Sequence, residues 1–135
     1  MTSKEALERY GQPSDNAPWM MVYKVPIDLQ VGVIPKKIFC NKDIQLMLEI
    51  AFENLISRGY TESELKTWDG CFNIRKKTSG INWSLHSWGL AIDVNAKDNC
   101  YGCESTLSSG FIECFTDAGF YWGGNFGDPM HFEKK

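Results

Sequence analysis

The chain has 135 residues, of which 43% are hydrophobic and 13% aromatic, and this composition is sufficient for one hydrophobic core. The net charge is −3 with both signs interspersed, which excludes the basic surface that a nucleic-acid partner requires. No apolar run approaches the roughly 20 residues of a membrane span, and the charged N-terminus lacks the apolar segment of a signal peptide. We therefore expect a single domain over residues 1–135, monomeric, made in the cytoplasm and without a membrane partner.

The N-terminal region predicts one helix and one strand. The sequence "SKEALERYG", residues 3–11, has helical character, with Ser3 as the expected cap and Gly11 as the stop. A loop follows, and the run "WMMVYKV", residues 19–25, favours a strand. We expect residues 1–34 to form the N-terminal helix and strand of the same domain as the rest of the chain.

The clearest helix is predicted for residues 43–60. Either Asn41 or Asp43 opens it, because both side chains can accept a hydrogen bond from a free backbone N–H, and Gly59 supplies its C-terminal stop. Its apolar side chains recur at helical spacing: Ile44, Met47, Leu48, Ala51, Leu55 and Ile56. We expect this stripe to face the core rather than a partner protein.

The second half of the chain predicts shorter elements of both kinds. In chain order we expect a strand at 71–77, a loop at 78–87, a strand at 88–95, a helix at 108–119, and strands at 120–124 and 130–134. On the expected helix, Phe111, Ile112, Phe115 and Ala118 share one face. Helical patterns combined with several short strands predict an α+β fold, in which a small antiparallel sheet packs with helices.

The cysteines are expected to be reduced thiols, because they are odd in number and the chain shows no secretion signal. They are Cys40, Cys71, Cys100, Cys103 and Cys114. Only Cys100 and Cys103 are close in sequence, and a C-x-x-C pair can be half of a zinc site or a redox pair. Because a structural zinc site needs four ligands and no second C-x-x-C occurs, two loop thiols beside a turn are favoured.

Asp93 raises the main chemical question. The run "GLAIDVN" alternates like a half-buried strand, and a carboxylate buried there needs a positive partner. That partner is either Arg75, in a salt bridge, or a metal ion. The two histidines, His86 and His131, each lie near a strand-like segment with a carboxylate close by. Two imidazoles and one carboxylate form a three-ligand zinc site with a fourth position for water, and the residues alone leave both partners open.

The segments "SLHSWGLAIDVN" and "FYWGGNFGDPMHFE" together resemble the VanY-type D-alanyl-D-alanine carboxypeptidase and L-alanyl-D-glutamate endopeptidase family of zinc peptidases, many of which are phage endolysins. The family pattern S-x-H-x-x-G-x-A-x-D, followed by D/E-x-x-H near the C-terminus, is met in full and in order. An upstream arginine also has its counterpart, in "CFNIRKK". The resemblance covers about residues 35–135.

The resemblance implies roles for six residues: His86, Asp93 and His131 as the ligands of one Zn²⁺ per chain, Asp128 as the general base, and Arg75 and Ser84 as substrate-binding residues. Arg75 would also polarise the scissile carbonyl and steady the oxyanion. Ser84 would hydrogen-bond the substrate or a group behind the ligands. Without the resemblance, Asp128 is a turn residue before a proline. Glu133 either supports a ligand or is a solvated edge charge.

The same resemblance implies a zinc metallopeptidase, a hydrolase acting on the peptidoglycan stem peptide. Its expected role is that of a bacteriolytic phage endolysin, which degrades the cell wall once released from the cytoplasm. Two alternatives stay open. A D-Ala-D-Ala carboxypeptidase or dipeptidase would trim soluble precursors, and would need a group that holds the terminal carboxylate. A non-catalytic zinc-binding module of the same fold would need no base, so the retention of Asp128 argues against it.

Overall fold

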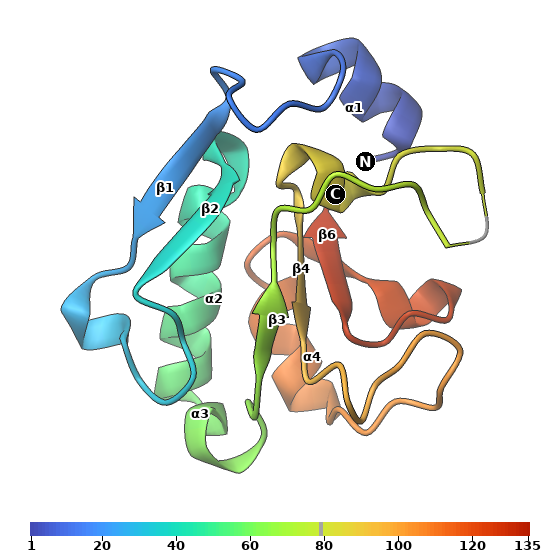
Figure 1. Cartoon of the computed structure of the whole chain (residues 1–135). Coiled ribbons are helices and arrows are strands. Elements are labelled where there is room, and N and C mark those ends of the chain that lie inside the picture. The colour runs from blue at the N-terminus through green and yellow to red at the C-terminus, as the bar shows by residue number, and fades with distance from the viewer. Residues whose placement is uncertain (79) are drawn as a thin grey trace.

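Helices and two antiparallel sheets make up the fold, seen in a computed structural model that describes residues 1–78 and 80–135 (Figure 1). The α+β class expected from the sequence is confirmed. The expected loop at 78–87 includes Ser79, which lies outside the described residues. Within the described part of the chain, no helix is both long and apolar enough to cross a bilayer.

The elements follow one another in a mixed order. The α-helices are α1 (Ser3–Tyr10), α2 (Gln45–Ser57), α3 (Tyr60–Ser63) and α4 (Ser109–Thr116). The strands are β1 (Met20–Lys24), β2 (Lys37–Asn41), β3 (Trp68–Gly70), β4 (Ala91–Val94), β5 (Phe120–Trp122) and β6 (His131–Lys134). Short 3₁₀ turns lie at η1 (Ile27–Leu29), η2 (Lys42–Ile44), η3 (Leu85–Trp88) and η4 (Gly123–Phe126). Two of these turns, η3 and η4, carry or precede predicted site residues.

The predicted caps of the first two helices are partly correct. Thr2, not Ser3, caps α1, because its hydroxyl accepts the N–H of Glu5 while the Glu5 carboxylate accepts from Thr2 in return. Gly11 ends α1 as predicted. Asn41 accepts the N–H of Asp43, but the turn that it caps is η2, and the α-helical part begins only at Gln45.

Helix α2 supplies the centre of the core. Its residues Leu48, Ala51 and Leu55 are fully buried, as is Ile44 at the end of η2, and Met47 and Ile56 pack against them. The apolar stripe therefore faces the core, as predicted. Helix α4 packs beside α2 and buries Phe111 and Phe115 on the predicted face. Removal of these aromatic and aliphatic side chains from water is the main force that holds the sheets and helices together.

The strand expected at 71–77 is wrong. The strand that pairs with β4 is β3, which ends at Gly70, and in the following segment only Lys76 forms an isolated bridge, with Trp83. The reason is that the pairing of β3 with β4 ends at Gly70, opposite Asp93. The segment after Gly70 leaves the sheet, and its Asn73 N–H donates to the His86 carbonyl of η3. The strands expected near 19–25, 88–95, 120–124 and 130–134 are all present.

The four-stranded sheet has the order β3-β4-β6-β5, all antiparallel. Successive residues of a strand point to opposite faces, so Ile92, Val94 and Phe132 turn one face of the sheet into the core, where all three are fully buried. The alternate residues of β4 and β6, among them Asp93 and His131, lie on the other face. Because one face of the sheet is buried in the core, these predicted site residues lie on the opposite face.

Candidate active site

Two of the predicted ligands lie on neighbouring strands. Asp93 on β4 and His131 on β6 are direct partners in the antiparallel register. Opposite residues of such a pair point to the same face, with Cβ atoms about 4.5–5.5 Å apart. The register therefore places the carboxylate beside the imidazole, although the two residues are far apart in the sequence.

The third predicted ligand, His86, lies in η3, the turn that leads into β4. Ser84 caps this turn, because its hydroxyl oxygen accepts the N–H of His86 (3.3 Å). Gly89 ends the turn in the left-handed conformation, with φ 65°, and a Cβ there would lie 2.7 Å from the backbone nitrogen of Asn41. Glycine alone satisfies both conditions. The close approach that Gly89 permits is thus to Asn41, and it fixes the path from His86 to Asp93.

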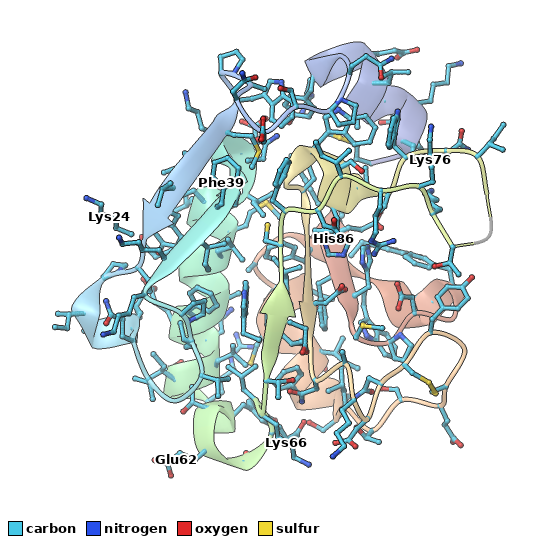
Figure 2. The ribbon with its side chains drawn as sticks, viewed as in Figure 1. Lys24, Phe39, Glu62, Lys66, Lys76 and His86 are labelled. Atoms are coloured by element: carbon cyan, nitrogen blue, oxygen red, sulfur yellow. A yellow bond between two sulfur atoms is a disulfide. The ribbon has the colours of Figure 1, made fainter. Side chains whose placement is uncertain are left out.

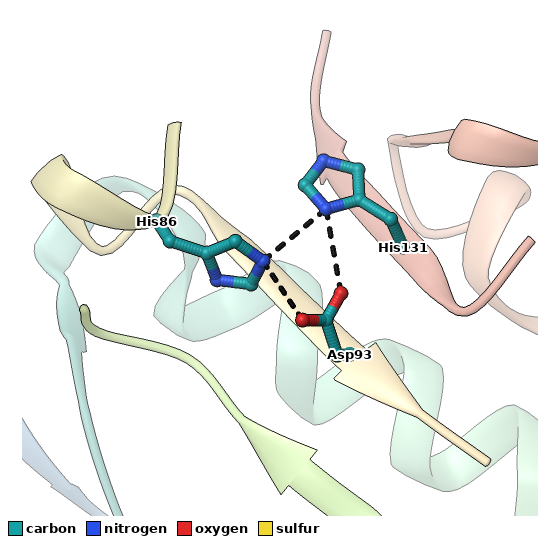
Figure 3. A group of neighbouring side chains, drawn as sticks. All are labelled: His86, Asp93 and His131. Atoms are coloured by element: carbon teal, nitrogen blue, oxygen red, sulfur yellow. Dashed lines mark hydrogen bonds and ion pairs between the residues drawn. The ribbon is translucent and has the colours of Figure 1, made fainter. Parts of the chain in front are cut away.

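The atoms of His86, Asp93 and His131 that could bind a metal ion face one another (Figure 3). His86 Nε2 lies 3.1 Å from Asp93 Oδ2 and 3.2 Å from His131 Nδ1, and His131 Nδ1 lies 3.4 Å from Asp93 Oδ1. Donors bound to one tetrahedral Zn²⁺ at about 2.0–2.1 Å are roughly 3.3 Å apart. The three side chains are therefore spaced as the ligands of one ion would be.

Hydrogen bonds on the outer side of each imidazole determine which nitrogen faces the centre. His86 Nδ1 lies 2.6 Å from the carbonyl oxygen of Cys71, and a carbonyl only accepts, so Nδ1 carries the proton and donates. His131 Nε2 likewise donates to the Glu133 carboxylate (2.8 Å). When both imidazoles are neutral, His86 Nε2 and His131 Nδ1 each carry a lone pair, and these lone pairs face each other and Asp93. Three converging acceptors repel one another unless a cation lies between them.

The electrostatics of the cluster favour a positive charge among the three side chains, whether it is a proton on His131 or a cation. Burial opposes ionisation of Asp93, yet hydrogen bonds to both histidines outweigh it and hold the pKa of Asp93 well below its usual range. Burial likewise opposes protonation of His131, but Asp93 and Glu133 raise the pKa of His131 to about 9. Asp93 Oδ1 remains buried without a hydrogen-bond partner among the described residues. The residues thus fit a bound cation, and two imidazoles with one carboxylate are a donor set suited to Zn²⁺.

Asp128 lies beside the three donors. A turn joins it to His131, whose N–H donates to the Asp128 carbonyl (3.1 Å), and its Oδ2 lies 3.8 Å from His131 Nδ1. Gly123 accepts the Asp128 N–H (2.8 Å), and a Cβ on Gly123 would lie 2.5 Å from the Asp128 carbonyl oxygen. Burial raises the pKa of Asp128, while the charges of His131 and Arg75 oppose the shift. Its Oδ1 is buried without a partner in the described residues, so this carboxylate is free to accept a proton.

Arg75 and Ser84, to which the resemblance assigns substrate binding, both line the cleft at this site. The Arg75 backbone is held beside η3, because its N–H donates to Ser87 Oγ (3.0 Å) and its carbonyl accepts from Ser87 Oγ (2.9 Å) and from the Ser84 N–H (2.9 Å). The alternative of an Asp93–Arg75 salt bridge is not what the described residues form: the ion pairs of Asp93 go to the two histidines. The observed role of Ser84 is to cap η3.

The cleft has a volume of about 690 Å³, and its wall includes aromatic side chains that the sequence left unassigned. These are Tyr101, Tyr121 and Phe126. Tyr121 and Phe126 stack with an interplanar angle of 15°, and Phe126 meets the ring of His131 edge to face at 5.9 Å. An aromatic wall therefore adjoins the predicted ligands.

Two tryptophans that lie near the predicted site residues in the sequence, Trp88 and Trp122, have structural roles. Trp88 is fully buried and donates to the carbonyl of Gly11 (2.8 Å), and Trp122 packs against the core and donates to the carbonyl of Pro129 (2.8 Å). The second contact holds the turn after Asp128. Neither ring is among the described residues of the cleft wall.

The expectation of reduced thiols at Cys100 and Cys103 is wrong. These residues form a disulfide, with their Cα atoms 5.1 Å apart, a separation within the range that a disulfide spans. Cys40, Cys71 and Cys114 are free and buried, as the expectation requires. The turn expected beside this pair is present, because the Cys103 N–H donates to the Cys100 carbonyl (3.0 Å). That turn brings the two sulfur atoms together.

Sequence reasoning missed two further contributors to the site. The Cys71 carbonyl orients His86, but a backbone acceptor leaves no signal in the residue type. Tyr101 follows directly on Cys100, and its place in the cleft depends on how the loop after β4 folds back. Glu133 had two interpretations, and its hydrogen bond to His131 favours the supporting one.

Residues 77–134 match a family model described as D-alanyl-D-alanine carboxypeptidase. No curated protein and no solved structure matches the chain. The matched segment contains His86, Asp93, Asp128 and His131, and it begins just after Arg75. It is shorter than the range 35–135 over which the motifs predicted a resemblance.

Proposed function

We propose that the chain is a zinc-dependent hydrolase of the peptidoglycan stem peptide, on the premise that residues 77–134 match the family model described as D-alanyl-D-alanine carboxypeptidase. One observation carries the zinc dependence: two imidazole lone pairs and a carboxylate face one another at 3.1–3.4 Å. One chain supplies the whole proposed site, so a monomer is sufficient.

In the proposed site, His86, Asp93 and His131 hold one Zn²⁺ per chain. When bound, the ion supplies Lewis acidity, which lowers the pKa of water and polarises a carbonyl group. The Cys71 carbonyl and Glu133 hold the two imidazoles in the tautomers that ligation requires. The side chains are thereby oriented before the ion arrives, which favours affinity.

Asp128 is the proposed general base. Its carboxylate is buried in the cleft, its pKa is raised by burial, and one oxygen is without a partner among the described residues. It takes a proton from the water that attacks the scissile carbonyl and returns it to the leaving amine. The base is separate from the three ligands, so ligation does not consume it.

Arg75 is proposed to stabilise the oxyanion. Arg75 lines the same cleft, and hydrogen bonds hold its backbone to Ser87 and Ser84. Because the carbonyl oxygen becomes fully negative only in the transition state, Arg75→Lys, which retains the charge but not the planar fork, should lower kcat by more than it raises KM. Steady-state kinetics on a soluble stem peptide measure both constants, with Lys76→Arg as control. A change confined to KM would leave Arg75 with substrate binding only.

Glu133 should contribute to zinc affinity without touching the ion. It accepts the Nε2–H of His131 at 2.8 Å, and loss of such an outer partner typically costs about 10–100-fold in metal affinity. We expect Glu133→Gln to weaken zinc binding within that range while the protein stays folded. Competition titration with a chelator gives the affinity, and Glu113→Gln, on the exposed side of α4, is the matched control. Unchanged affinity in Glu133→Gln would make it an edge charge.

The bond that is cut distinguishes the two enzymatic candidates. We propose a wall-degrading endopeptidase of the endolysin type. The carboxypeptidase alternative has support of its own: the family description names that activity, and the cleft holds Lys77 in addition to Arg75, which could bind a terminal carboxylate. Incubation with purified sacculi and with a soluble pentapeptide, followed by mass spectrometry of the products, separates them. Release of D-alanine alone supports the alternative, and no cleavage of either substrate by zinc-loaded protein contradicts both.

We further propose that the protein acts outside the cytoplasm, at the cell wall. The Cys100–Cys103 disulfide supports this location, because disulfides persist in oxidising compartments and are rare in the cytoplasm. An endolysin would be made in the cytoplasm and acquire the disulfide after release. Thiol labelling of protein recovered from the two compartments tests the proposal, and a reduced pair in active protein at the wall would contradict it.

A further inference from the structure

The long connection between β4 and α4 is more ordered than a simple linker. It begins at Asn95, which holds the left-handed conformation (φ 52°) and whose side chain accepts the N–H groups of Lys66 and Thr67 (2.9 and 3.1 Å). Asn99 is fully buried, donates to the Asn95 carbonyl (3.2 Å) and accepts the N–H of Thr106 (2.9 Å). Two asparagine side chains therefore fix both arms of the connection.

The tip of this connection is closed a second time, by the Cys100–Cys103 disulfide. We call residues 100–103 the disulfide loop. Its Gly102 adopts φ 80°, and the Gly102 N–H donates to the Gly127 carbonyl at 2.7 Å. Gly127 immediately precedes Asp128, so the disulfide loop is tied to the segment that carries the proposed base.

Tyr101 is the side chain that this loop presents. It lines the cleft, and 49% of its surface is exposed, although a large aromatic side chain gains from burial. Tyr121 and Phe126, which line the same cleft, are also about half exposed. Three partly exposed aromatic rings in one cleft form an apolar surface that becomes buried only when a ligand covers it.

We propose that Tyr101 is a substrate-contacting residue that sets the affinity for the stem peptide, and that the disulfide loop holds it in position. The inference rests on the proposed function for the identity of the ligand. A tyrosine ring packs well against methyl and methylene groups, which the alanine and γ-linked side chains of a stem peptide provide, and its hydroxyl can hydrogen-bond a peptide group. Arg75 and Lys77, in the same cleft, match the carboxylates of such a peptide.

Measurement of peptide binding to a variant that has lost most of its hydrolytic activity tests this directly. In zinc-loaded Asp128→Asn protein, Tyr101→Ala should raise the Kd of a soluble stem pentapeptide about tenfold, as for other aromatic anchors truncated to alanine. Tyr101→Phe should stay within about twofold, because it keeps the ring. Isothermal titration gives the Kd. Phe39→Ala is the control, since Phe39 is a partly exposed aromatic residue on β2 outside the described cleft wall (Figure 2).

A double-mutant cycle tests the role of the disulfide loop. Cys100→Ser with Cys103→Ser should raise the Kd about threefold when Tyr101 is present and not at all when Tyr101 is alanine, because the loop acts through that side chain. Zinc content should be unchanged in every variant. Equal Kd values for Tyr101 and Tyr101→Ala, additive effects of the two changes, or loss of zinc or fold in Tyr101→Ala would each overturn the inference.

Failure of the proposed function gives a different pattern. If zinc-loaded wild-type protein does not cleave the stem peptide, the proposed activity fails, while the Kd comparison in the Asp128→Asn form still decides whether Tyr101 contacts a peptide. If cleavage occurs and the Kd is insensitive to Tyr101, only the inference fails. If the pentapeptide binds measurably neither to the Asp128→Asn protein nor to its Tyr101→Ala variant, the inference is overturned as well.

Discussion

Asp128→Asn is expected to abolish most of the hydrolytic activity while the protein keeps its fold and its zinc. General-base catalysis is typically worth about 10²–10⁴-fold, so kcat should fall within that range or further. Zinc should remain, because His86, Asp93 and His131 complete the proposed ligand set without Asp128. The substitution preserves the size of the side chain and removes its negative charge, and the Asp128 backbone contacts that form the turn stay in place.

The measurement combines single-turnover kinetics with metal analysis on the same preparation. Asp98→Asn is the matched control: it removes the same charge from an exposed side chain, whose ion pair with Lys66 spans 3.8 Å, and it should leave turnover unchanged. Near-wild-type turnover by zinc-loaded Asp128→Asn protein would exclude the base and leave Asp128 as a turn residue.

Loss of a single ligand is expected to have an equally large effect, through the metal itself. His86→Ala and Asp93→Ala each remove one of three donors, so zinc affinity should fall by more than the about 10–100-fold that an outer partner costs. Activity should fall with zinc occupancy. Wild-type protein should also melt at a higher temperature in excess zinc, because zinc at 100 times its Kd stabilises the folded state by about 2.7 kcal/mol. The two variants should show little or no such shift.

Metal analysis after dialysis and thermal melts with and without zinc provide the two readouts. The Cys100→Ser/Cys103→Ser variant is the control, because the disulfide pair lies outside the ligand set and its loss should leave zinc occupancy intact. Full occupancy in either His86→Ala or Asp93→Ala would contradict the ligand assignment. Loss of zinc from the cysteine variant would instead indicate a second metal site.

Local patterns in the sequence were sufficient for the elements whose stability is local. Helix α2 follows from apolar residues at helical spacing, and the turn η2 before it follows from Asn41, whose side chain accepts the N–H of Asp43 two residues along the chain. Strand β4 follows from the alternation of Leu90, Ile92 and Val94, which the core then buries. The choice of Ser3 over Thr2 as a cap was wrong by one residue, because helix boundaries depend on backbone angles that residue type leaves open.

Two features that depend on backbone geometry were predicted less well. Strand β3 exists where β4 offers hydrogen bonds, at Trp68–Gly70, and not where its own residues favoured a strand. The disulfide depends on a turn that points Cys100 and Cys103 at each other, whereas the odd cysteine count and the missing secretion signal favoured thiols. In both cases the deciding geometry, a strand pairing for β3 and a local turn for the disulfide, is not determined by residue type alone.

By itself, the sequence determined which residues could form a metal site and a base, since those chemical types and their motif spacing are written in the chain: His86, Asp93, Asp128 and His131. Only the tertiary structure decided their geometry. The antiparallel register sets Asp93 opposite His131, and the Cys71 carbonyl and Glu133 select the nitrogens that face the centre. It also decided that Tyr101 enters the cleft. The physical reason is that register, tautomer and loop position result from hydrogen bonds between segments that only folding brings together.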